Sequence, residues 1–137
     1  MEQQGNNVFI LSQAFSEELR VKYGRKFIPK QVIIPEGDSK KEVYVILNGE
    51  VFVTTKILTG YRIIATLGPG EIFGEMAFFD DTPRTATIIA KTNVEAVVLK
   101  PENFVEVYKK SPEWTLSIVS FLSHRISATI KTVEELY

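Results

Sequence analysis

The sequence contains no cysteine and a single histidine, His124, among its 137 residues. The absence of cysteine excludes disulfide bonds and thiolate metal sites, and one histidine leaves few ligands for a metal centre. The formal net charge of −1 gives no basic field to attract nucleic acid. No apolar run approaches the roughly 20 residues of a membrane-spanning helix, and Met1–Asn7 does not resemble a signal peptide. We therefore expect a cytoplasmic protein with no metal, membrane or direct nucleic-acid partner.

The remaining composition is that of one ordinary globular domain, with 45% hydrophobic and 24% charged residues. Short β-rich segments alternate with turn residues, a spacing typical of an antiparallel barrel or sandwich. Asn48-Gly49 predicts a hairpin between the segments on either side of it, because both residues tolerate positive φ. The predicted strands are 27–28, 32–34, 43–47, 51–55, 61–67, 85–90 and 94–99.

Helical patterns precede and follow these strands. Apolar spacing from Val8 to Leu19 predicts a short helix or two. Pro101 suits the first position of a second helix, whose core-facing residues would be Phe104, Val107 and Tyr108. Ser111-Pro112 predicts the start of a third helix, with Ser111 as N-cap, that continues without Gly or Pro to Leu136.

The last predicted helix carries apolar or small residues at alternating spacings of three and four. This heptad pattern predicts a seam for a homodimer. The alternative is that the same residues pack the helix on its own barrel, as we expect for Trp114 and Phe121. The seam residues are Val119, Leu122, Ile126, Thr129, Val133 and Leu136.

The segment from Leu67 to Thr87 combines glycines, a carboxylate and an arginine. Three glycines within residues 68–74 permit positive φ and close approach of a ligand to the backbone. Glu75 can accept hydrogen bonds from sugar hydroxyls, and Arg84 can fork onto a phosphate. The residues between them suffice for one helical turn, whose free N–H groups attract an anion. A phosphate beside a ribose would satisfy all these groups.

Simpler interpretations of the same segment exist. Glu75 and Arg84 alone would also suit a structural ion pair. Catalysis is poorly supported, since the glycines fit neither a Walker loop nor a dinucleotide fingerprint and no serine lies in a nucleophile elbow. We therefore predict no catalytic residue and no enzyme.

Two motifs point to a family. Residues 70–77 (GEIFGEMA) and 82–87 (TPRTAT) resemble the phosphate-binding cassette of cyclic nucleotide-binding domains, which occur in catabolite-activator transcription factors, cAMP-dependent kinase regulatory subunits and cyclic nucleotide-gated channels. The resemblance extends to residues 35–38 and 44–51 and covers residues 20–136 in all. It implies a mainly β fold, a double-stranded β-helix (jelly-roll) barrel with an N-terminal helix and a long C-terminal helix.

The resemblance also implies a domain organisation. Residues 1–19 would form a helical lead-in, and residues 20–100 the jelly-roll barrel, with the cassette at 70–87. Residues 101–137 would form C-terminal helices that act as a lid or a dimer helix. Together these parts make one cyclic nucleotide-binding domain.

The cassette residues take individual roles from the resemblance. Glu75 would hold the ribose 2′-hydroxyl and Arg84 the cyclic phosphate. The backbone N–H groups of Met76 and Ala77 would add donors, and Gly74 would let the sugar approach. Met76 stands where leucine is commoner, a change that conserves volume.

Other residues would contact the base. Val53 and Ile64 would form apolar walls, and Arg125 and Thr129 would reach it from the final helix. Thr85 would offer its hydroxyl and N–H, and it is compatible with both cAMP and cGMP, since one hydroxyl discriminates by only about 1–2 kcal/mol. We favour cAMP.

The resulting hypothesis is a cyclic-nucleotide receptor that needs no cofactor. Ligand binding would close the C-terminal helix over the base and signal to an unidentified downstream protein. The alternatives are a ligand-free jelly-roll interaction module, or the N-terminal sensor fragment of a larger transcription regulator or channel. A cupin-type enzyme shares the jelly roll but requires several metal-binding histidines.

Overall fold

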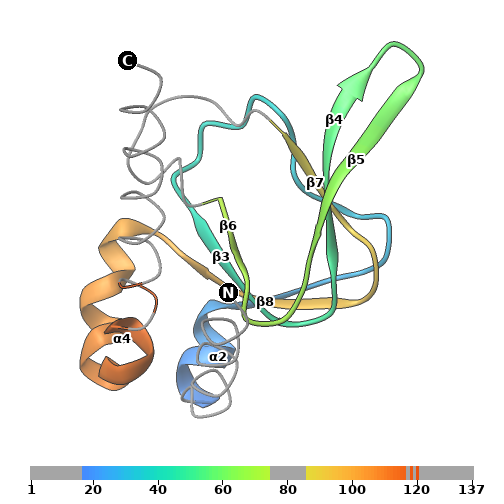
Figure 1. Cartoon of the computed structure of the whole chain (residues 1–137). Coiled ribbons are helices and arrows are strands. Elements are labelled where there is room, and N and C mark those ends of the chain that lie inside the picture. The colour runs from blue at the N-terminus through green and yellow to red at the C-terminus, as the bar shows by residue number, and fades with distance from the viewer. Residues whose placement is uncertain (1–16, 75–85, 117, 119, 121–137) are drawn as a thin grey trace.

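The computed structural model describes residues 17–74, 86–116, 118 and 120. Two four-stranded antiparallel sheets dominate it, with strand orders β1-β8-β3-β6 and β2-β7-β4-β5 (Figure 1). The strands are β1 Gly24–Phe27, β2 Val32–Ile34, β3 Val43–Asn48, β4 Val51–Ile57, β5 Gly60–Leu67, β6 Ile72–Phe73, β7 Thr87–Ala90 and β8 Val94–Leu99. The helices are α2 Glu17–Tyr23, the 3-10 helix η1 Pro101–Asn103 and α4 Phe104–Lys110, and residues 112–116 are also helical.

The inner faces of both sheets enclose one apolar cluster, which we call the barrel cluster. Its members alternate along each strand with residues that face away, as the two-residue period of a strand requires. Except for the β4–β5 pair, consecutive strands lie in different sheets, so the two sheets share this core. The barrel cluster consists of Ile34, Tyr44, Ile46, Val51, Phe73, Ile88, Ala90, Val94, Ala96 and Val98.

The outer face of the β1-β8-β3-β6 sheet is covered by the helices, which form a second cluster with it. We call this the helix cluster. Strand β3 is therefore buried on both faces, which explains its uninterrupted apolar sequence. The helix cluster consists of Leu19, Val43, Val45, Leu47, Ile72, Val97, Leu99, Val107, Trp114 and Ile118.

These layers confirm the predicted mainly β jelly roll with flanking helices, and most of the predicted strands. Trp114, 2% exposed, and Val107, fully buried, lie in the core as predicted. Of the predicted long C-terminal helix, the structure describes residues 112–116, 118 and 120. All six seam residues therefore lie outside the described residues, as do Phe121 and His124. Among the helices that the structure describes, none has the length and apolarity to cross a bilayer.

The predicted hairpin at Asn48-Gly49 is wrong. Strands β3 and β4 on either side of this turn belong to different sheets, and the turn carries the chain from one sheet to the other. Gly49 has a φ of +89°, and a Cβ there would lie 2.0 Å from the carbonyl oxygen of Asn93. The glycine therefore serves a close crossing with the β7–β8 turn. The actual long hairpin is β4–β5, which projects from the barrel in Figure 1.

Smaller corrections concern element ends and one core residue. Helix α2 continues past the predicted end at Leu19 to Tyr23, and β1 begins three residues before the predicted strand at 27–28 and ends at Phe27. Strand β6 was not predicted, because two residues carry no periodicity. Tyr108 is 49% exposed rather than buried, since the face of α4 at Val107 already fills the contact with the sheet.

Replacing Gly49 by alanine should destabilise the domain more than the same change at Gly37. Gly37 also has a positive φ, +87°, but an added Cβ there meets nothing within 4 Å. Gly37→Ala should cost only the left-handed strain of about 1–2 kcal/mol. Gly49→Ala should add about 1–3 kcal/mol for displacing the Asn93 backbone. Urea unfolding of both variants measures the difference, and equal losses would contradict the crossing as the reason for Gly49.

Candidate functional site

The chain enters the predicted cassette from a turn tied to β3. Glu71 N–H donates to the Gly68 carbonyl at 3.0 Å across Pro69, which closes the turn. Gly70 N–H donates to the Ile46 carbonyl at 2.8 Å, and Ile46 N–H donates to the Glu71 carbonyl at 3.0 Å. The start of the motif is therefore an extension of the β3 ladder.

Strand β6 fixes the next two residues on opposite faces of the sheet. Ile72 packs in the helix cluster, whereas Phe73 packs in the barrel cluster and stacks on Tyr44 with ring centroids 4.7 Å apart and an interplanar angle of 10°. Gly74 follows with a φ of +83°, which a residue with a Cβ rarely adopts. This backbone turn directs the chain out of β6 at the predicted ligand-binding residue Gly74.

The chain returns from the cassette into the other sheet, at Ala86 and β7. Thr87 is 4% exposed, and its hydroxyl accepts a hydrogen bond from Glu36 N–H at 3.1 Å. The hydroxyl of Thr54, 2% exposed, donates to the Thr87 carbonyl at 2.8 Å. The sequence prediction missed both threonines, although a polar residue at a strand position next to apolar ones was the available signal.

Of the other nine predicted site residues, the structure describes two, Val53 and Ile64. Val53 is half-buried and packs against the barrel cluster, which contains Phe73. Ile64 is 57% exposed and lies at a bulge of β5, between the Val53–Ala65 and Thr54–Ile63 register pairs. The structure therefore brings Val53, but not Ile64, to the cluster that precedes Gly74. The predicted residues Glu75, Met76, Ala77, Arg84, Thr85, Arg125 and Thr129 lie outside the described residues.

A match to a family model spans both sides of this site. The model, described as the cyclic nucleotide-binding domain, matches residues 24–111, from β1 to the end of α4. The chain belongs to the cyclic nucleotide-binding domain family. Its ligand class is therefore a cyclic nucleotide, cAMP or cGMP. Within the ranges that the structure describes, no group of three or more His, Cys, Asp or Glu residues could hold a metal ion.

Individual relatives carry the same domain. The chain is 29% identical over 106 residues to the cyclic AMP receptor protein of Thermus thermophilus, covering 76% of this chain and 49% of that protein. It is 38% identical over 76 residues to the cAMP-dependent protein kinase regulatory subunit of Yarrowia lipolytica, covering 56% of this chain and 20% of the relative. The crystal structure of the Thermus thermophilus catabolite activator protein superposes with a TM-score of 0.63 at 25% identity, over 92% of this chain and 62% of that one. The chain thus spans half or less of these curated relatives.

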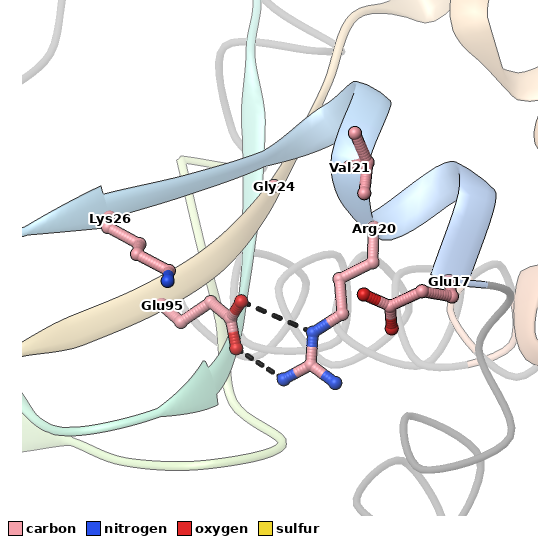
Figure 2. A pocket seen from close by; sticks show the side chains of 6 residues that line it. All are labelled: Glu17, Arg20, Val21, Gly24, Lys26 and Glu95. Carbon is pink, nitrogen blue, oxygen red and sulfur yellow. Dashed lines mark hydrogen bonds and ion pairs between the residues drawn. The ribbon is translucent and has the colours of Figure 1, made fainter.

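A surface depression of this cyclic nucleotide-binding domain lies beside α2, lined by residues of α2, β1 and β8. Figure 2 shows the guanidinium of Arg20 directed at Glu95 of β8, with Lys26 on the other side of the carboxylate. Arg20 Nε donates to Glu95 Oε2 at 3.2 Å, Arg20 Nη2 donates to Glu95 Oε1, and Asn48 Nδ2 donates to the same Oε1 at 3.2 Å. The fork from Arg20 lowers the pKa of Glu95 and raises that of Arg20. Since these charges satisfy each other, we interpret the depression as a structural ion pair between α2 and the sheet.

A second set of polar contacts joins α2 to α4. Lys22 Nζ lies 2.8 Å from both carboxylate oxygens of Glu106, and the Tyr23 hydroxyl donates to the same carboxylate at 2.9 Å. Lys110 pairs with Glu18 at the other end of the contact. The two helices consequently lie side by side against the sheet, as Figure 1 shows.

The ion pair of Glu95 with Arg20 makes the stability of the fold depend on pH. Because its pKa is lowered in the folded chain, Glu95 stabilises the fold above its ordinary pKa of 4.5, and this contribution is lost as the pH falls through the folded value. Glu95→Gln should lower the free energy of unfolding by about 1 kcal/mol at pH 7. The variant should also lose less stability than the wild type between neutral and acidic pH.

Urea unfolding across this pH range measures both effects. Glu102→Gln, at an exposed acid in η1, is the matched control and should follow the wild-type profile. A Glu95→Gln profile parallel to that of the wild type would contradict the assignment.

Proposed function

We propose that the chain is a cAMP receptor domain with a binding rather than a catalytic role, and that it binds the nucleotide through the cassette between Gly74 and Ala86. One observation carries this proposal: the family match spans both anchored ends of a segment that retains a carboxylate, Glu75, and an arginine, Arg84. An acid and a guanidinium at these positions supply partners for a ribose and a phosphate.

The proposed contacts follow the chemistry of each group. Glu75 accepts hydrogen bonds from the ribose 2′-hydroxyl, and Arg84 forks onto the cyclic phosphate. The N–H groups of Met76 and Ala77 add neutral donors to the anion. Gly74 supports this arrangement, because its positive φ and missing side chain let the sugar approach the backbone.

The base is proposed to lie on the barrel side. Val53 faces the barrel cluster and supplies an apolar wall, with the exposed Ile64 at its rim. Thr85 contributes a hydroxyl and an N–H, while Arg125 and Thr129 of the final helix cover the base. This arrangement buries an aromatic ring against apolar side chains, which is favourable.

The preference for cAMP rests on the relatives. The Thermus and Yarrowia proteins are named for cAMP, and the Yarrowia segment is the more similar of the two, at 38% identity. The chain carries threonine at position 85, which can contact either base, so cGMP is the competing ligand.

Signalling is proposed to pass through the helices to a downstream protein. Ile72, which lies in the cassette two residues before Gly74, shares the helix cluster with Trp114 and Ile118. A ligand that binds one arrangement of the cassette better than another would shift the helix packing through this contact. The final helix is proposed to close over the base and to pair with a second copy through its heptad seam.

Arg84→Leu should abolish most of the affinity for cyclic nucleotide. Removing the guanidinium leaves the phosphate without its charged partner, which should weaken binding by roughly 2–5 kcal/mol, or at least about 30-fold. Isothermal titration calorimetry with cAMP and cGMP measures this loss and should give the tighter wild-type binding for cAMP.

Arg62→Leu is the matched control, because Arg62 lies exposed on β5 and should change affinity by no more than about twofold. Equal binding by wild type and Arg84→Leu would overturn the site. A wild type that binds neither nucleotide would favour the ligand-free interaction module.

The dimer seam is tested by Ile126→Glu. A carboxylate at the centre of an apolar seam should convert a dimer to a monomer, since burying an unpaired charge costs several kcal/mol. Sedimentation equilibrium measures the change, with His124→Glu, outside the seam positions, as the control that should remain dimeric. A dimeric Ile126→Glu variant or a monomeric wild type would contradict the seam.

A further inference from the structure

Two buried threonines hold the main chain where it leaves the cassette. Thr54 and Thr87 face each other in the β4–β7 ladder, and the Thr54 hydroxyl donates to the Thr87 carbonyl at 2.8 Å. The Thr87 hydroxyl accepts the N–H of Glu36 at 3.1 Å. Thr87 is thus fixed through its main chain by β4 and through its side chain by the loop after β2.

These threonines lie on the outer face of their sheet. Ile88 and Ala90 belong to the barrel cluster, so alternation along β7 turns Thr87 away from the barrel. Thr54 is the register partner of Thr87 and shares its face, next to the inward-facing Val53. A nucleotide on the barrel side would not touch either hydroxyl. Any effect of the hydroxyls on a ligand is therefore indirect, and the hydrogen bonds of both hydroxyls meet at Thr87.

The hydroxyls have a positional rather than a space-filling role. Valine would fill the same volume and suit a buried strand equally well, whereas a buried hydroxyl is unfavourable unless it is hydrogen-bonded. Each hydroxyl is hydrogen-bonded to a backbone group of another segment: that of Thr54 to the Thr87 carbonyl, and that of Thr87 to the Glu36 N–H. Thr87 follows Arg84 by three residues, which span at most roughly 10 Å. The orientation of Thr87 therefore restricts where the guanidinium can reach.

We propose that Thr54 and Thr87 are positioning residues, which hold the arginine side of the cassette in its binding geometry from the far face of the sheet. This proposal rests on the proposed function, because it assigns the two hydroxyls to the affinity for cyclic nucleotide. Neither residue contacts the ligand. Their contribution is to fix the position and direction of the main chain at Thr87 before the ligand binds, which is an ordering cost that binding would otherwise have to meet.

The test is calorimetric titration of the full chain with cAMP. Thr54→Val removes the hydroxyl and keeps the shape, and it should raise Kd about tenfold, the effect of one hydrogen bond of ordinary net strength. The number of binding sites per chain should stay unchanged. This number is the control for misfolding, because an unfolded fraction of the protein would lower it without changing the Kd of the folded molecules. Thr54→Ser restores a hydroxyl and should return Kd to within about twofold of the wild type.

Thr92→Val is the matched control. The Thr92 hydroxyl donates to a backbone carbonyl, that of Asn93 at 3.0 Å, and accepts the N–H of Glu50 at 3.0 Å, but it lies beyond the other end of β7. This variant should keep the wild-type Kd. Unchanged binding by Thr54→Val, or an equal loss in Thr92→Val, overturns the positioning role while leaving the proposed function intact.

Two further outcomes are decisive. If Thr54→Val does not fold, Thr87→Val, which removes only the acceptor for Glu36 N–H, decides the proposal by the same criterion. A wild type that does not bind cAMP overturns the proposed function and the positioning role together.

Discussion

Burial of β3 and β8 on both faces is the constraint on which the rest of the domain depends. Val45 and Ile46 are adjacent and fully buried, yet one packs with the helices and the other inside the barrel. Each fully buried aliphatic side chain contributes about 1.5–3 kcal/mol, so the two clusters outweigh the surface ion pairs. The same holds in strand β6, where Ile72 packs with the helices and Phe73 packs inside the barrel. The chain consequently enters the cassette attached to the helices on one side and to the barrel on the other.

Ion pairs and hydrogen bonds orient the helices on the sheet, which the apolar clusters alone do not determine. The Arg20–Glu95 fork fixes α2 over the end of β8, and Lys22 and Tyr23 meet Glu106 of α4. These contacts are exposed or partly buried, and they join α2 to β8 and to α4. Their role is therefore to orient the helices on the sheet, while burial supplies most of the stability.

The sequence predicted what local periodicity controls and missed what distant contacts control. Strand β8 appears with its predicted bounds, because apolar β-formers there lie between clear turn residues. The Asn48-Gly49 prediction failed because the hairpin rule is local, whereas the backbone of Asn93 decides the conformation of Gly49. Of the candidate site, the described residues place Gly74 and Val53 around the barrel cluster and leave Ile64 exposed. The Thr54–Thr87 contact joins positions too far apart in the sequence for any motif to reveal.

We propose that a cyclic nucleotide binds on the barrel side between the ends of β6 and β7. A crystal structure of the chain grown with excess cAMP is the decisive experiment. We expect a cyclic phosphate beside the segment between Gly74 and Ala86, paired with Arg84, and an adenine ring against Val53. Nucleotide density at another place, or this part of the barrel filled by the chain's own side chains, would contradict it.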